Sequence, residues 1–135
     1  MSNYLLIKQG TIHNAIEEEP FVADILVENG KIKKIAPVLE GKIINDADVI
    51  DATRIDVYPG FVDAHCHMGL DGYATGFAGE DYNESGDPVT PQLSAVDAVN
   101  PQDETFQMAR EGGVTCVCTG PGSSNVIGGT FCAIK

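Results

Sequence analysis

The dipeptide Pro59-Gly60 divides the sequence into two stretches of different character. Proline fixes φ and has no N–H donor, and glycine adopts conformations closed to other residues, so a strand does not continue through this pair. Short apolar runs punctuated by Gly, Asn and Pro precede the pair, whereas a β-prone run, a long loop and a helical pattern follow it. We therefore predict two domains, residues 1–58 and residues 59–135.

The first stretch predicts β structure built from short strands. Asn29-Gly30 separates two of its apolar runs, and this dipeptide favours a two-residue hairpin because both residues accept positive φ. Lys33-Lys34 interrupts the alternation of the following run, which indicates a bulge. Several short strands with such punctuation predict a small sandwich or barrel-like sheet. The expected strands are residues 4–9, 12–15, 21–28, 31–36, 49–52 and 55–58.

The second stretch predicts a mixture of strands and one helix. Residues 61–67 are β-prone and mostly uncharged, as a buried parallel strand would be. Asn100-Pro101 is a favourable helix start and Gly112-Gly113 a favourable helix end. A buried strand is expected at 114–119 and a further one at 131–134. The order strand, loop, helix, strand, loop, strand predicts the beginning of a parallel α/β fold.

The charge of the chain argues against nucleic acid and anionic membranes as partners. There are 20 acidic and 8 basic residues, a formal net charge of −12. No Lys or Arg lies between Arg54 and Arg110, where ten acids occur, from Asp56 to Glu104. Such a stretch repels phosphates and tolerates cations. The longest apolar runs have four residues, too few for a membrane span or a signal-peptide core, so we expect a cytoplasmic protein.

His65 and His67 are the candidate metal ligands. Residues i and i+2 of a strand point to the same face, so both imidazoles can reach one ion. Zn²⁺, Fe²⁺ and Mn²⁺ accept nitrogen ligands at about 2.1 Å. Asp63 shares this face and is a candidate to orient a ligand. By itself the pair is also consistent with histidines that are merely packed or exposed.

The residues around this pair carry a family resemblance. The segments VIDA at 49–52 and YPGFVDAHCH at 58–67 resemble the signature of the metal-dependent amidohydrolase superfamily, which includes imidazolonepropionase and dihydroorotase. EGGVTCV at 111–117 is similar to the family's segment at the second barrel strand. The resemblance implies an α/β protein in which part of a small N-terminal β-sandwich (1–58) precedes the first strands of an incomplete (β/α)₈ TIM barrel (59–135).

The resemblance also implies an activity. Such enzymes hydrolyse carbon–nitrogen bonds other than peptide bonds in small linear or cyclic amides and amidines. His65 and His67 would be metal ligands, with zinc favoured over iron or manganese, and the metal would polarise the scissile carbonyl and activate water. A (β/α)₈ barrel takes about 250 residues, so the remaining catalytic groups are expected beyond Lys135. We expect an N-terminal fragment that is inactive alone and associates with itself to cover open strand edges.

Several alternatives remain open at this stage. Lys135 ends a predicted strand and is a candidate carboxylated bridging lysine, whereas His13 is expected to have a surface or packing role. Cys116 and Cys118 share a face and, with His65 and His67, would make a small Cys₂His₂ structural zinc module. Buried free thiols are the simpler interpretation. Residues 120–125 lack the lysine of a phosphate loop and suggest substrate contacts or turn geometry. A non-catalytic binding or assembly protein is the last alternative.

Overall fold

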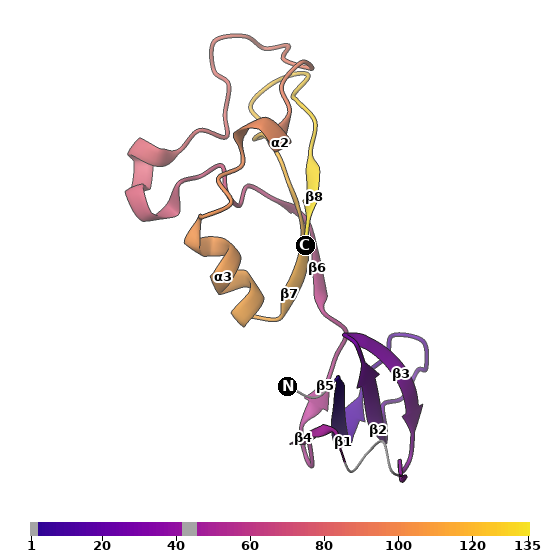
Figure 1. The fold of residues 1–135 in the computed structure, drawn as a ribbon. Coiled ribbons are helices and arrows are strands. Elements are labelled where there is room, and N and C mark those ends of the chain that lie inside the picture. The colour runs from indigo at the N-terminus through magenta and orange to yellow at the C-terminus, as the bar shows by residue number, and fades with distance from the viewer. Residues whose placement is uncertain (1–2, 42–45) are drawn as a thin grey trace. The chain divides into compact units, whose positions relative to one another are not determined.

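The computed structural model describes residues 3–41 and 46–135. The chain divides into two compact units, residues 1–59 and 60–135. Each unit contains one open sheet, so the fold is mixed α/β with strands predominating (Figure 1). No barrel closes within the described ranges, and the strands that the resemblance assigned to an incomplete barrel form an open sheet.

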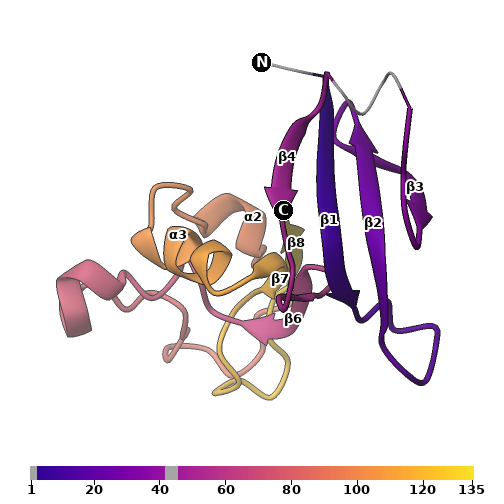
Figure 2. The ribbon, with the colours of Figure 1, turned by 90° about the horizontal axis from the view of Figure 1, so that it is seen from below.

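The N-terminal unit is one five-stranded sheet. Its strands are β1 (Tyr4–Ile12), β2 (Phe21–Glu28), β3 (Lys31–Ala36), β4 (Asp48–Asp51) and β5 (Asp56–Val57). The order is β3-β2-β1-β4, as Figure 2 shows, and β5 also pairs with β1. β1 is antiparallel to β2 but parallel to β4 and β5. The described residues of this unit form one open sheet, where the sequence predicted part of a small sandwich or a barrel-like sheet. The runs predicted at 4–9 and 12–15 form mainly one bulged strand.

The hairpin between β2 and β3 is confirmed. Asn29 and Gly30 have φ angles of 51° and 75°, as the predicted two-residue turn requires. Leu26 of β2 pairs with Lys34 of β3, but the next residue, Val27, pairs with Ile32. Lys33 is therefore an extra residue in β3. This shift is the bulge that the interrupted alternation predicted.

A second bulge lies in the central strand β1. Ile7 pairs with Ile25 and Gly10 with Ala23, so two residues of β1 face Asp24 alone. Close to the bulge, a Cβ on Gly10 would lie 2.7 Å from a methyl carbon of Val57, so β5 can approach β1 only because this residue is glycine. The sheet carries two small apolar clusters, centred on Leu6, Leu26 and Leu39 and on Ile12, Ala23 and Ile25.

The C-terminal unit has a three-stranded sheet in the order β6-β7-β8. The strands are β6 (Phe61–Cys66), β7 (Val114–Thr119) and β8 (Cys132–Ile134), and the helices are η1 (Tyr73–Gly79), α2 (Ala95–Ala98) and α3 (Glu104–Glu111). β6 and β7 are parallel, as predicted, with α3 in the crossover between them. β8 is antiparallel to β7, so the prediction of parallel strands is wrong there. The connection to β8 contains no helix, and the chain folds directly back.

The helix α3 begins later than the sequence predicted. Asp103 is its N-cap, and the Asp103 carboxylate accepts the Thr105 N–H at 2.9 Å. Asn100 instead accepts the Gln102 N–H in a turn that precedes the helix. The helix ends before Gly112-Gly113, as predicted, and it lies alongside β7 (Figure 1).

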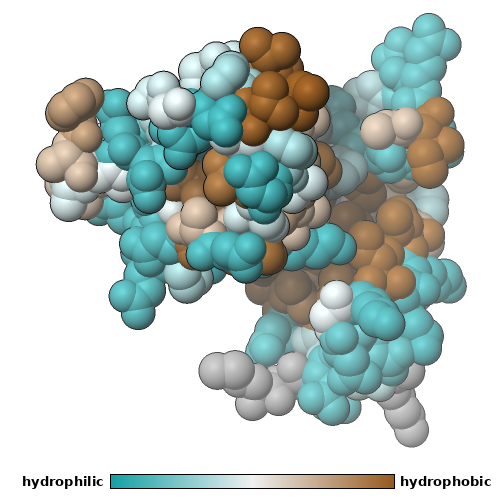
Figure 3. Space-filling view, turned by 90° about the horizontal axis from the view of Figure 1, so that it is seen from above, coloured by the Kyte–Doolittle hydropathy of each residue, from teal (hydrophilic) through white to brown (hydrophobic). Residues whose placement is uncertain are grey.

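The strands of this unit are less buried than predicted. Phe61 and Val62 of β6 are 54% and 68% exposed, whereas Val117 of β7 is buried. Together with Val117, the buried apolar side chains of the unit are Leu70 and Ala95. Figure 3 shows hydrophobic side chains at the surface among the hydrophilic ones. No helix in the described ranges has the length and apolar character needed to cross a membrane.

Candidate metal centre

The two histidines lie at the carboxyl end of β6. His65 is the penultimate residue of β6, and His67 follows its last residue. Because β6 and β7 are parallel, their carboxyl ends meet at one edge of the sheet, where ligand sites of α/β proteins are usually found. Gly120 follows β7 at this edge, and its N–H donates to the Cys66 carbonyl at 3.2 Å. The sheet therefore brings His65, His67 and Gly120 together.

The spacing of the two imidazoles suits one metal ion. The ring centroids of His65 and His67 are 5.3 Å apart, and the ring planes are nearly perpendicular, at 82°. Two imidazoles bound to one ion through bonds of about 2.1 Å at a tetrahedral angle have centroids about 5 Å apart. The donor set, two imidazole nitrogens, suits zinc, iron or manganese.

His67 is held in one hydrogen-bonded state. Its Nδ1 lies 2.6 Å from the carbonyl oxygen of Gly120. A carbonyl oxygen only accepts, so Nδ1 carries the proton and donates it, and the lone pair of a neutral ring is then at Nε2. The ring also stacks on Tyr82, with centroids 4.8 Å apart and planes 16° from parallel. A protonated Nδ1 bonded to a carbonyl is the usual arrangement of a metal-binding histidine.

His65 is less enclosed. Its ring lies 4.9 Å from the ring of Phe131, which precedes β8, and its side chain is exposed to solvent. The Asp63 carboxylate accepts the backbone N–H of His65 at 3.1 Å. Asp63 therefore holds the backbone of β6, where the sequence had suggested that it orients an imidazole. The pairing of β6 with β7 is irregular between Asp63 and Cys66, and this breaks the strict alternation on which that suggestion depended.

Two connecting segments, residues 82–90 and 120–130, join beside the histidines. The Gly122 N–H donates to the Tyr82 carbonyl at 2.7 Å, and the Ser124 hydroxyl donates to the Asn83 side-chain oxygen at 2.9 Å. The Asn125 side chain donates to the Asp87 carbonyl at 2.7 Å. The region predicted as a long loop is thus fixed to a second loop by hydrogen bonds. The sequence had marked residues 120–125 as a turn or contact loop but offered no signal for Tyr82 or Phe131.

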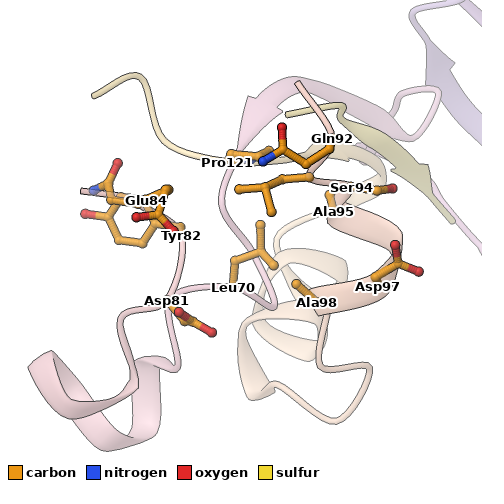
Figure 4. A pocket seen from close by; sticks show the side chains of 12 residues that line it. Leu70, Asp81, Tyr82, Glu84, Gln92, Ser94, Ala95, Asp97, Ala98 and Pro121 are labelled. Carbon is orange, nitrogen blue, oxygen red and sulfur yellow. The ribbon is translucent and has the colours of Figure 1, made fainter. Parts of the chain in front are cut away.

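A pocket of about 300 Å³ adjoins this arrangement. Figure 4 shows Tyr82 and Glu84 on one side, Gln92, Ser94, Ala95 and Pro121 on the other, and Leu70 between them. Tyr82 also stacks on His67, so this tyrosine separates the pocket from one of the two histidines. The carboxylates in the lining are Asp81, Glu84 and Asp97, and the lining has no lysine or arginine.

The other candidate residues lie elsewhere. No three His, Cys, Asp or Glu side chains gather into a metal-binding group in residues 3–41 and 46–135, so the Cys₂His₂ module does not form there. The four cysteines are free thiols. His13 bonds Asp56 at 2.9 Å and stacks on Tyr58 in the N-terminal unit. Lys135 follows β8, whose antiparallel direction carries it away from the edge that holds His67. The bridging role considered for Lys135 therefore has no support.

Comparisons with known proteins agree with the resemblance. No protein-family model matches the chain. The chain is 34% identical over 116 residues to amidohydrolase tasK of Hapsidospora irregularis, covering 85% of this chain and 12% of that protein. It is 46% identical over 68 residues to dihydropyrimidinase 1 of Caenorhabditis elegans, covering 50% of this chain and 13% of that protein. A crystal structure of an amidohydrolase from Thermotoga maritima MSB8 matches 97% of this chain with a TM-score of 0.85 and 43% identity.

The matched proteins are much longer than this chain. The chain spans 12–17% of the curated relatives it matches, which also include proteins named dihydroorotase and allantoinase. It spans 33% of the Thermotoga protein.

Proposed function

We propose that this chain, which matches a short part of amidohydrolase-superfamily proteins, carries two metal ligands of a hydrolase acting on carbon–nitrogen bonds other than peptide bonds. The observation that carries the proposal is the state of His67. Its Nδ1–H is bound to the Gly120 carbonyl, so Nε2 is left as the ligand atom, and His65 lies at a spacing that suits a shared ion.

In this proposal His65 and His67 hold a divalent metal, with zinc favoured and iron or manganese as the alternatives. When bound, a divalent metal supplies Lewis acidity toward a scissile carbonyl and toward a water nucleophile. Gly120 fixes the tautomer of His67, and Asp63 fixes the backbone of His65. A catalytic zinc site has three protein ligands, and the described residues bring two together, so we expect the 135-residue chain alone to be inactive.

The proposal assigns β6 and β7 to the first two strands of a (β/α)₈ barrel. The parallel pairing of these strands, the α3 crossover and the position of the histidines at the carboxyl edge support this assignment. The greater length of the matched relatives supports the view that further strands and ligands belong to the intact enzyme.

The substrate that we propose is a small cyclic amide that is neutral or positively charged. Relatives named for dihydropyrimidine and allantoin turnover support the cyclic amide class. The lining of the pocket beside His67 supports the charge, because its ionisable groups are carboxylates that repel an anionic substrate.

The test is a zinc titration of the ¹⁵N-labelled chain followed by NMR. We expect zinc to perturb the ring nitrogens of His65 and His67, and we expect His65→Ala or His67→Ala to remove the response. His13→Ala is the matched control, because His13 is the third histidine and lies in the other unit. A response that is centred on His13, or that survives both alanine substitutions, would refute the proposal.

A second measurement separates the zinc module from the proposed enzyme. Cobalt bound to thiolate absorbs strongly in the near ultraviolet, whereas cobalt bound only to imidazole and water does not. We expect no thiolate band, and the same cobalt spectrum for the Cys116→Ser variant. A thiolate band that is lost in Cys116→Ser would favour the Cys₂His₂ module instead.

A further inference from the structure

We propose that Tyr82 is a positioning residue for His67, acting through a clamp formed by Tyr82, Asn83, Gly120, Gly122 and Ser124. The clamp holds the His67 ring in the form that carries its proton on Nδ1. The inference rests on the proposed function in one respect, because the importance of this form lies in leaving Nε2 for a metal.

The clamp contacts His67 in two ways. The Tyr82 ring lies flat against the imidazole, 4.8 Å away between centroids and 16° from parallel, and this contact restricts rotation of the ring. The Gly120 carbonyl lies at the edge of the imidazole, 2.6 Å from Nδ1. A ring whose plane and one nitrogen are both fixed has one tautomer available while it is neutral.

The two sides of the clamp are tied to each other. The Gly122 N–H donates to the carbonyl of Tyr82 at 2.7 Å, and the Ser124 hydroxyl donates to Asn83 at 2.9 Å. A Cβ on Gly122 would overlap the Asn83 side-chain oxygen and lie 2.8 Å from a ring carbon of Tyr82, so any larger residue would displace these side chains. The segment that carries the stacking ring and the segment that carries the accepting carbonyl are therefore joined by two hydrogen bonds beside His67.

The clamp decides which nitrogen of His67 is available. A free neutral imidazole side chain favours the proton on Nε2, which would block that nitrogen as a ligand. The hydrogen bond made by the other nitrogen overrides this preference. Partners that orient a ligating histidine in this way change metal affinity by about 10–100-fold when they are removed.

The position of Tyr82 suggests that its ring, and not its hydroxyl, carries the effect. The contact with His67 is ring on ring, and Tyr82 also forms a wall of the adjacent pocket. We therefore expect Tyr82→Phe to keep the His67 tautomer and Tyr82→Leu, which has no flat face, to release it. A role limited to packing predicts no change in the tautomer of His67 for either variant.

The experiment records long-range ¹H–¹⁵N NMR spectra of the histidine side chains in the full chain without metal. The pH is kept high enough for the imidazoles to be neutral, because only a neutral ring has two tautomers. Wild type and Tyr82→Phe should show His67 with its proton on Nδ1, and Tyr82→Leu should show a mixture of both tautomers. Tyr73→Leu, at an exposed tyrosine of η1, is the matched control and should resemble wild type. The zinc affinity should fall about tenfold in Tyr82→Leu and stay unchanged in Tyr82→Phe.

An unchanged His67 tautomer in folded Tyr82→Leu would overturn the inference. If Tyr82→Leu does not fold, Ser124→Ala replaces it, because this change removes one tie and leaves the ring in place. Ser124→Ala should then show a smaller shift in the same direction, and the absence of any shift would overturn the inference. If wild type binds no zinc while Tyr82→Leu still changes the tautomer, the proposed function fails and the positioning role of Tyr82 stands.

Discussion

Replacement of Asp24 should reveal what holds the bulged centre of the N-terminal sheet. Asp24 is fully buried in β2 and faces the bulge of β1. Its carboxylate accepts three bonds, from the Gln9 backbone N–H at 2.9 Å, the Gln9 side chain at 3.2 Å and the Leu39 N–H at 3.0 Å. The bulge turns the Gln9 N–H away from the strand ladder, and Asp24 supplies the acceptor that the ladder no longer provides.

The size of the effect follows from these bonds. In Asp24→Ala the buried Leu39 amide loses its acceptor, which costs about 1–3 kcal/mol, and the half-buried Gln9 amide adds about 1 kcal/mol. These costs sum to about 2–4 kcal/mol. Removal of a buried charge recovers part of its desolvation cost, so we expect a net loss of about 1–3 kcal/mol in the free energy of unfolding. Asp24→Asn keeps one accepting oxygen and should cost about 1–2 kcal/mol.

The same carboxylate should make stability depend on pH. Burial raises the pKa of Asp24, but the hydrogen bonds from Leu39 and Gln9 and the nearby Lys8 outweigh it, so the pKa lies below its ordinary value of 3.8. A group whose pKa is lower in the folded state contributes stability that is fully present above the unfolded value and is lost as pH falls through the folded value. Asp24→Asn should remove this part of the acid sensitivity.

The assay is urea unfolding followed by NMR amide signals of β1 and β2, which report on this unit separately. Asp48→Asn, at an exposed carboxylate of β4, is the matched control and should unfold like wild type. A loss smaller than about 1 kcal/mol in Asp24→Ala would refute the role of these bonds. An acid sensitivity of Asp24→Asn equal to that of wild type would refute the origin given for the pH dependence.

Three further outcomes are expected. Asp103→Ala removes the N-cap of α3 and should lower the stability of this helix by about 1 kcal/mol. Amide hydrogen exchange in residues 104–111 should become faster, and unchanged exchange rates would contradict the prediction. Gly30→Ala places a side chain on a residue with φ 75° and should lower the free energy of unfolding by about 1–2 kcal/mol. Gly128→Ala should be neutral, because a Cβ at Gly128 would meet no atom within 4 Å, and equal effects of the two substitutions would refute this interpretation of the turn. Light scattering should show concentration-dependent self-association, because Phe61 and Val62 are exposed, and a monomer at every concentration would argue against it.

The local features of the fold were predictable because they depend on neighbouring residues. Asn29-Gly30 determines its own turn, and Gly112-Gly113 ends the helix that precedes it. The start of that helix was misplaced because Asn100 and Asp103 are both good caps, and Asn100 caps the preceding turn instead. The buried state predicted for β6 depends on elements that would cover it, and most of its side chains are exposed in the described chain.

The candidate site was predictable only in part, for the same reason. The i and i+2 spacing of His65 and His67 is local and indicates the pair. The groups that fix the state of His67, Tyr82 and Gly120, come from two other segments and carry no signature in the sequence. The irregular pairing of β6 with β7 near Asp63 is likewise a product of two strands and cannot be read from one.

The histidine site and the pairing of β6 with β7 depend on each other. Three hydrogen bonds join residues 66–68 to residues 119–120: Gly120 N–H to the Cys66 carbonyl, His67 Nδ1–H to the Gly120 carbonyl, and the buried Thr119 hydroxyl to the Met68 carbonyl. A shift of one residue in the pairing would exchange the faces of the strand and remove all three. The tautomer of His67 therefore reports the register of the sheet, and metal bound at Nε2 would in turn favour the chain in which β6 and β7 are correctly paired.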